Sequence, residues 1–151
     1  MSKNKKTLLV NGALGRMGQA VIGVCKNRND IEIKYAVDLP IHKYQEESIY
    51  SERDRRKFKL QDIKISKNIK AVDVDLIIDF STPISSISLA KKAGILGVPF
   101  VTGTTGFNLR QINELKKISK KIPILQSYNM SLGINLLVKI IKENVDYFSS
   151  T

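Results

Sequence analysis

The stretch LLVNGALGRMG, residues 8–18, decides the fold that we expect for the rest of the chain. Gly12, Gly15 and Gly18 are spaced three apart, directly after a short apolar run. A glycine-rich turn between a strand and a helix leaves backbone N–H groups at the helix N-terminus, where an anion is favoured. The spacing G-x-x-G-x-x-G is looser by one residue than the common dinucleotide pattern. The glycines alone therefore leave two interpretations open, a phosphate cradle or a turn whose glycines are structural.

The residues on either side of the glycines predict a strand before them and a helix after them. Residues 7–10, TLLV, are typical of a buried strand, and residues 31–38 alternate as a second strand should. An acid at its end, Asp38, lies twenty residues after Gly18, where a carboxylate can accept hydrogen bonds from a ribose. Asp38 therefore favours the dinucleotide cradle. The helical spacing from residue 17 predicts one inward face, made of Met17, Ala20, Val21, Val24 and Cys25.

Asp38 and its neighbour also bear on the choice of cofactor. A carboxylate repels the 2′-phosphate of NADPH, and the next residue is Leu39 rather than the arginine that would attract this phosphate. These two residues favour NADH, although Arg16 or Lys43 could offset the preference.

The remaining sequence repeats the alternation of short apolar runs and helical patterns. This alternation predicts an α/β fold of the Rossmann type, with a doubly wound, mostly parallel sheet and helices on both faces. Gly94 is expected to close one helix, after a start at the capping residue Thr82. Residues 39–62 carry mixed charges without a period and predict a surface segment with at most a turn of helix. Further strands are expected at 63–66, 74–81, 99–106 and 123–129, and further helices at 83–93, 109–121 and 131–148.

Two polar stretches follow predicted strands and should lie at one edge of the sheet. DFSTP occupies residues 79–83 and TGTTG occupies residues 102–106. The carboxyl ends of parallel strands form the edge at which open α/β sheets bind ligands. Each stretch alone is typical of a helix start, but both together with the glycine turn predict a cleft. Its amides and hydroxyls are suited to the nicotinamide or its ribose.

The sequence contains few residues suited to catalysis. Its only histidine, His42, falls in the charged segment and is expected to be solvated. No His, Cys and Asp residues have metal-ligand spacing, and no Ser-His-Asp arrangement can be proposed. A single cysteine, Cys25, excludes an intramolecular disulfide and suits a reducing compartment. We therefore predict a cofactor cradle with no catalytic residue and no metal site in this sequence.

The net charge of +11, from 25 basic and 14 acidic residues, permits a nucleic-acid partner. The lysines are spread among isoleucines and asparagines instead of forming one stripe. All three residue types are encoded by AT-rich codons, so a biased genome accounts for the charge without such a partner. No apolar run approaches the ~20 residues that cross a bilayer. We expect neither nucleic acid nor membrane as a partner.

Four stretches together resemble the bacterial dihydrodipicolinate reductase family: NGALGRMG, DFSTP, TGTTGF and YNMSLGIN. This resemblance implies a Rossmann-type N-terminal domain and hydride transfer from NADH or NADPH in the diaminopimelate route to lysine. It also implies a homotetramer and a cytoplasmic setting. The family often has an arginine where this sequence has Leu39. The cofactor contacts that it implies are Gly12, Ala13, Leu14, Gly15, Arg16 and Met17 for the pyrophosphate, Asp38 for the ribose, Gly103, Thr104 and Thr105 near the nicotinamide, and Ser127, Tyr128, Asn129 and Met130 at the domain junction.

The resemblance also divides the chain. Residues 1–130 are expected to form the dinucleotide-binding domain, and residues 131–151 the first helix of a substrate and oligomerisation domain. This helix has one apolar face and a second apolar stripe, so we expect other parts of a protein to cover it on both sides. The family's His-His-x-x-x-Lys segment, which supplies the proton donor and binds substrate carboxylates, would follow Thr151. We therefore expect the cofactor half of a reductase; the alternatives are a non-catalytic nucleotide-binding module and, less favoured, a basic nucleic-acid binder. The helix face consists of Ile134, Leu137, Val138, Ile141, Val145 and Phe148, and the stripe of Leu136, Ile140 and Tyr147.

Overall fold

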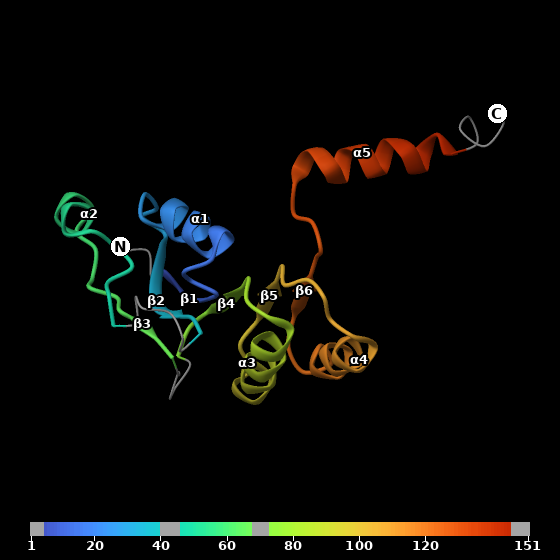
Figure 1. The fold of residues 1–151 in the computed structure, drawn as a ribbon, viewed down its shortest axis with the longest axis horizontal. Coiled ribbons are helices and arrows are strands. Elements are labelled where there is room, and N and C mark those ends of the chain that lie inside the picture. Colours follow the sequence, from blue (N-terminus) through green and yellow to red (C-terminus); the bar gives the residue numbers. More distant parts are fainter. Residues whose placement is uncertain (1–4, 40–45, 68–72, 146–151) are drawn as a thin grey trace.

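The computed structural model describes residues 5–39, 46–67 and 73–145, which form an α/β fold (Figure 1). His42, Lys43, Tyr147 and Phe148 lie outside these residues. The described strands are β1 (Lys6–Asn11), β2 (Ile31–Val37), β3 (Ile65–Ser66), β4 (Leu76–Asp79), β5 (Phe100–Thr102) and β6 (Ile124–Gln126). The described helices are α1 (Arg16–Cys25), α2 (Glu52–Phe58), α3 (Pro83–Leu96), α4 (Leu109–Ile118) and α5 (Leu132–Glu143).

The strands pair in parallel in the order β3-β2-β1-β4-β5-β6. The chain winds outward from β1 in one direction to β3, and then returns beside β1 to wind the other way through β4, β5 and β6. This order is that of the doubly wound Rossmann fold, and it confirms the predicted fold class. The direction of winding reverses between β1 and β4, so ligands are expected above the carboxyl ends of these two strands.

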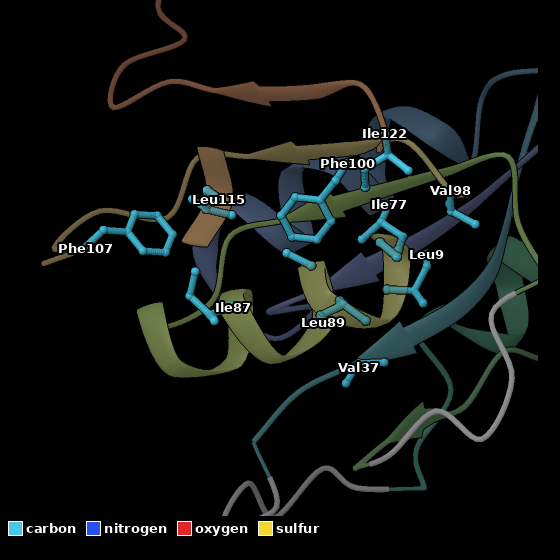
Figure 2. Close-up of a cluster of buried hydrophobic side chains, with 12 residues drawn as sticks. Leu9, Val37, Ile77, Ile87, Leu89, Val98, Phe100, Phe107, Leu115 and Ile122 are labelled. Atoms are coloured by element: carbon cyan, nitrogen blue, oxygen red, sulfur yellow. The ribbon is translucent and has the colours of Figure 1, made fainter. Parts of the chain in front are cut away.

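The alternation of side chains along β1 divides the core into two clusters on opposite faces of the sheet. Leu9 faces α3 and α4 and packs in a cluster with Phe100, as Figure 2 shows. Leu8 and Val10 face the other side, where Ile22 of α1 joins them. Because both faces are covered, the central strands are apolar on both sides, as parallel strands usually are. The predicted helices on both faces are thereby confirmed.

The predicted inward face of α1 is partly wrong. Met17 and Val24 are 49% and 64% exposed, although both belong to that predicted face. The helix instead presents Gly18 to the glycine-rich turn after β1, where a Cβ would lie 2.1 Å from the carbonyl oxygen of Gly12. A pattern that counts only apolar residues cannot find a contact face that begins with a glycine. The buried residues of α1 are Gly18, Ile22 and Cys25.

Helix α2 corrects the prediction that residues 39–62 contain at most one turn of helix. It spans seven residues, begins at the cap Ser51, which accepts the N–H of Asp54, and ends at Lys59 with φ +53°. None of its residues is buried, so no apolar period announces it in the sequence. Acidic residues in its first turn and basic residues in its last turn match the helix dipole instead. Just before it, Tyr50 packs into the cluster beneath α1.

Helix α3 starts as predicted but ends later. The hydroxyl of Thr82 accepts the N–H of Ser85 and caps the helix. The helix closes at Gly97, whose φ of +74° is the left-handed conformation that favours glycine. Gly94 therefore does not close it. This residue lies within α3 at the contact with α4, where a Cβ would meet the Ile118 side chain at 2.9 Å.

Helix α5 projects away from the sheet after β6 (Figure 1). Its cap is Ser131, as predicted, and both of its predicted apolar stripes are exposed in the described part of the chain. Ile134 on one stripe is 45% exposed and Leu136 on the other is 55% exposed. Within the described ranges, no helix combines the length and apolar character needed to cross a membrane.

Candidate functional site

Three strands end in register at the point where the winding reverses. Asn11 of β1 pairs with Asp79 of β4, which pairs in turn with Thr102 of β5. The glycine-rich turn follows Asn11, and the stretches DFSTP and TGTTG begin at Asp79 and Thr102. The fold therefore brings these three segments, which were predicted to form a cleft, to the same edge of the sheet. This is the edge that binds ligands in open α/β sheets.

The glycine-rich turn after β1 is held against two neighbouring strands. Gly12 has φ +78°, and a Cβ there would lie 2.3 Å from the carbonyl oxygen of Phe80. The N–H groups of Gly12 and Ala13 both donate to the carbonyl oxygen of Val37, and the Ala13 side chain is buried. The conformation and the close approach together require glycine at position 12.

Helix α1 begins without a side-chain cap. Its N-cap residue is Gly15, which has no side chain to accept an N–H group. The first N–H groups of a helix have no partner within it, and the helix dipole adds positive potential there. The start of α1, beside the exposed Arg16 and Met17, is therefore suited to an anion. The other described helices begin with Ser51, Thr82, Asn108 and Ser131, each of which accepts a backbone N–H through its side chain.

Asp38, directly after β2, is fixed against the same turn. Its Oδ2 atom accepts the N–H of Leu14 at 2.6 Å, and its Oδ1 atom accepts the N–H of Leu39 at 2.7 Å. A carboxylate offers about four lone-pair sites, so it can hold the turn and accept from a ligand hydroxyl at the same time. The sequence predicted the place of Asp38 correctly, but not its bond to the glycine-rich turn.

Two adjoining cavities lie along this edge. A cavity of about 210 Å³ is bounded by the glycine-rich turn, by Asp38 and by the segment after β4. A second cavity, of about 400 Å³, shares Asp38 and Leu39 and extends along α3. Its lining includes apolar side chains such as Leu89 and two basic ones, Lys67 and Lys92. The cavities together offer space for an extended ligand beside the uncapped helix.

Asp79 is the centre of a buried hydrogen-bond network beneath this edge. Its side chain is fully buried. Its Oδ1 atom accepts from the Asn11 amide at 2.7 Å and from the Ser81 hydroxyl at 2.6 Å. Its Oδ2 atom accepts from the hydroxyls of Thr102 and Thr104 at 2.7 Å and 2.8 Å. Four donors thus satisfy the carboxylate, which ties together the ends of β1, β4 and β5.

The sequence pattern predicts no separate role for Asp79 or Asn11, and it includes Thr102 only as part of the TGTTG stretch. The available signal was that three buried strands each end on a polar residue at the same register position. Polar groups that are buried must find partners, and these three find one another. The network adds Ser81 to the candidate site, because its N–H donates to the Thr104 hydroxyl at 2.9 Å.

The residues expected near the nicotinamide lie beside this network. Gly103 packs on the Phe80 ring, where a Cβ would meet a ring carbon at 2.1 Å. Thr104 is buried, whereas Thr105 is exposed. None of these threonines lines the two cavities at this edge. The fold brings them to the same sheet edge as the glycine-rich turn, but not into direct contact with its cavities.

The four residues expected at the domain junction follow β6. The Ser127 N–H donates to the Thr102 carbonyl oxygen at 3.1 Å, and its hydroxyl donates to the Asn129 carbonyl oxygen. The Asn129 side chain accepts the N–H of Ser131 at the start of α5. Tyr128 and Met130 are 61% and 41% exposed. This segment connects the sheet edge to α5.

Residues 6–130 match the family described as dihydrodipicolinate reductase, N-terminus. This chain belongs to that family. The match spans the sheet, the glycine-rich turn and the segment after β6, and it ends just before α5 begins.

The curated relatives are longer than this chain. A 4-hydroxy-tetrahydrodipicolinate reductase from Buchnera aphidicola subsp. Cinara cedri (strain Cc) is 40% identical over 146 residues, which cover 93% of this chain and 51% of that protein. The protein of the same name from Pelagibacter ubique (strain HTCC1062) is 36% identical over 136 residues, covering 89% and 47%. The chain therefore spans about half the length of the curated relatives that it matches.

Solved structures confirm the fold. Dihydrodipicolinate reductase from Paenisporosarcina sp. TG-14, with dipicolinate bound, superposes with a TM-score of 0.69 and 17% identity over 95% of this chain and 55% of that one. A myo-inositol 2-dehydrogenase from Lactobacillus plantarum superposes with a TM-score of 0.63 and 14% identity, covering 95% and 42%. At such identities the likeness supports the fold alone.

Proposed function

We propose that this chain binds a pyridine nucleotide and serves as the nucleotide-binding part of a 4-hydroxy-tetrahydrodipicolinate reductase. The observation that carries the proposal is the uncapped start of α1, with Asp38 fixed against the turn before it. The chain's membership of the reductase family and the names of its relatives support the choice of ligand. In that reaction the bound nucleotide would supply a hydride.

The residues of the chain divide the work of holding the nucleotide. The N–H groups at the start of α1 would bind the pyrophosphate, and Asp38 would accept from the adenosine ribose. The turn after β5 would flank the nicotinamide, with the Asp79 network fixing its position. The proposed contacts are Gly12, Ala13, Leu14, Gly15, Arg16, Met17, Asp38, Gly103, Thr104, Thr105, Ser127, Tyr128, Asn129 and Met130.

NADH is the nucleotide that we propose the chain prefers. The Asp38 carboxylate lies on the shared border of the two cavities, where a further negative phosphate would be repelled. Leu39 next to it offers no charge to offset this repulsion. Lys67 and Lys92 line the larger of these two cavities, so we expect the preference for NADH over NADPH to be moderate.

Isothermal titration calorimetry of the chain with NADH and with NADPH tests this proposal. We expect saturable binding of one NADH per chain, with weaker binding of NADPH. Asp38→Asn should weaken NADH binding about tenfold, because it removes a charged hydrogen-bond acceptor. Asp73→Asn, at an exposed ion pair with Lys34, removes the same charge elsewhere and should leave binding unchanged. Absence of NADH and NADPH binding would overturn the proposal.

A second candidate function is a nucleotide-binding module without turnover of its own. The described residues of both apolar stripes of α5 are exposed, and this observation favours it. The family resemblance places the proton donor, a His-His-x-x-x-Lys segment, after residue 151, so the test concerns residues 1–151 alone. We expect the chain to bind NADH but to show no reductase turnover alone; measurable turnover would contradict this. Codons encoding such a segment downstream of residue 151 would favour a reductase, and their absence would favour the module.

We also propose the setting that the family resemblance implies. The reductase would act in the cytoplasm and assemble as a homotetramer, in which α5 would enter the substrate and oligomerisation domain at residues 131–151. The buried single thiol of Cys25 suits a reducing compartment. Analytical ultracentrifugation of a chain as long as the curated relatives tests whether four copies assemble.

A further inference from the structure

A third cavity lies at the opposite edge of the sheet from the proposed nucleotide site. Its volume is about 370 Å³, within the usual range for sites that bind small molecules. It is bounded by Lys5 before β1, by the first residues of β2 and by the segments that follow α1 and α2. No residue of this lining also lines the two cavities at the carboxyl edge.

The buried side chains that line this cavity are apolar apart from one hydroxyl. Cys25 and Ile33 are 7% and 2% exposed, and Phe58 and Leu60 of the α2 region join them. Tyr50 is only 6% exposed, yet among the described residues none forms a hydrogen bond with its hydroxyl. Burial raises the pKa of Tyr50 to about 12, so the hydroxyl stays protonated and can donate. The hydroxyl oxygen itself is open to the cavity, because Arg55 Nε is the only fully buried side-chain nitrogen or oxygen in the described residues that lacks a partner. It can therefore donate to a ligand there.

The rim of the cavity carries an excess of positive charge. Five of its residues are basic and one is acidic. Two of the basic residues are compensated, because Arg28 pairs with Asp30 at 2.5 Å and Lys26 with Asp54 at 3.3 Å. The other basic residues of the rim are Lys5, Lys57 and Lys59, and none of them forms an ion pair with a described residue. The Lys57 ammonium lies over the Phe58 ring, 5.0 Å from its centre, a contact that leaves its charge without a counter-ion.

The ends of the two helices do not account for these lysines. The carbonyl oxygen of Cys25 at the end of α1 accepts the N–H of Arg28. The carbonyl oxygen of Arg55 in the last turn of α2 accepts the N–H groups of Lys59 and Leu60. Backbone groups therefore satisfy these carbonyls, and the ammonium groups remain available for a ligand.

We propose that this cavity binds a small aromatic phosphate monoester. The buried apolar side chains suit a flat ring, the Tyr50 hydroxyl can donate to the phosphate, and three ammonium groups without an ion pair suit a dianion better than a monoanion. The cavity shares no lining residue with the proposed nucleotide site, so both ligands should bind at once. The inference does not rest on the proposed function.

Titration of the full chain with phenyl phosphate, followed by amide chemical shifts in ¹H–¹⁵N NMR spectra, tests this site. We expect saturable shifts at Ile31, Tyr50 and Leu60, with no displacement by NADH. Inorganic phosphate and benzyl alcohol, each of which has only half of the probe's chemistry, should shift these signals far less. Equal effects from either half, uniform shifts at lysines over the whole surface, or displacement by NADH would each overturn the inference.

Variants at the rim sharpen the test. Lys57→Gln with Lys59→Gln should weaken phenyl phosphate binding about tenfold, since two screened charge contacts are lost. Tyr50→Phe keeps the ring and should weaken binding about threefold through the lost hydrogen bond. Lys116→Gln with Lys120→Gln, on the α4 side, removes the same charge and should change nothing. Equal losses of phenyl phosphate affinity in both double variants would show that binding depends on net charge alone, and would contradict the proposed site. NADH binding measured on the same samples separates a failure here from a failure of the proposed function.

Discussion

The sheet contains two strand-turn-helix units side by side, β1 with α1 and β4 with α3, and their turns are built in opposite ways. The turn before α1 relies on backbone: Gly12 approaches the carbonyl of Phe80, and Gly15 leaves the helix uncapped. The turn before α3 relies on side chains, because Thr82 caps the helix and Asp79 collects four donors. The first unit leaves its N–H groups for a ligand, whereas the second uses its polar groups within the protein. One topology therefore yields a binding turn beside a supporting one.

The largest effect is expected from a side chain at Gly12. Gly12→Ala adds a Cβ about 2.3 Å from a carbonyl oxygen at φ +78°, so it should lower the free energy of unfolding by about 3 kcal/mol and abolish NADH binding. Gly97→Ala is the matched control, because Gly97 has φ +74° but no atom within 4 Å of a Cβ. It should cost only about 1 kcal/mol, the conformational part alone. Urea denaturation measures both, and equal losses would contradict the role of close approach.

The next largest effect tests the supporting turn. Asp79→Asn replaces a charged acceptor of four hydrogen bonds with an amide whose NH₂ group faces other donors. We expect a loss of about 2–3 kcal/mol in the free energy of unfolding. NADH affinity of the folded fraction should fall less than with Asp38→Asn, because Asp79 is buried beneath the edge. Ser81→Ala removes one donor and should cost about 1 kcal/mol. A negligible effect of Asp79→Asn in denaturation would remove its structural role.

These two turns also explain what the sequence could and could not predict. Backbone requirements leave a direct trace, since only glycine fits at Gly12, and the order of apolar runs predicts the strands. A side-chain network leaves none, because Asp79 and Asn11 find each other across 68 positions of sequence. Gly94 shows the same limit from another direction: a glycine in a helix is a contact point or an end depending on its neighbours, and Gly94 is a contact point. Helix α2 has no buried face, so no apolar period could predict it.

A smaller effect should separate the uncapped start of α1 from the capped starts of α3 and α4. Thr82→Ala removes the hydroxyl that caps α3 and should cost about 1 kcal/mol in the free energy of unfolding. Asn108→Ala at α4, where a reciprocal capping box exists, should cost a similar amount or slightly more. Gly15→Ala at α1 should cost less from capping, since Gly15 has no side chain to lose. Thermal unfolding with a calorimeter measures all three, and an equal capping loss at Gly15 would contradict the contrast between the units.

The smallest effect concerns the amino ends of the same two units, which Asp75 joins. Its carboxylate accepts from Lys6 at 2.8 Å and from the Thr7 N–H at 2.8 Å, and these bonds lower its pKa from 3.8 to about 2. The unfolded chain therefore binds more protons than the native chain between about pH 4 and pH 2, so stability is full above this range and falls as the pH falls through it. Asp75→Asn should lower stability slightly at pH 7 and flatten the decline below pH 4. Because the group is exposed to solvent, the change should be small, and urea midpoints across this pH range measure it. An unchanged slope below pH 4 would mean that the Asp75 carboxylate adds nothing measurable to the contact between β1 and β4.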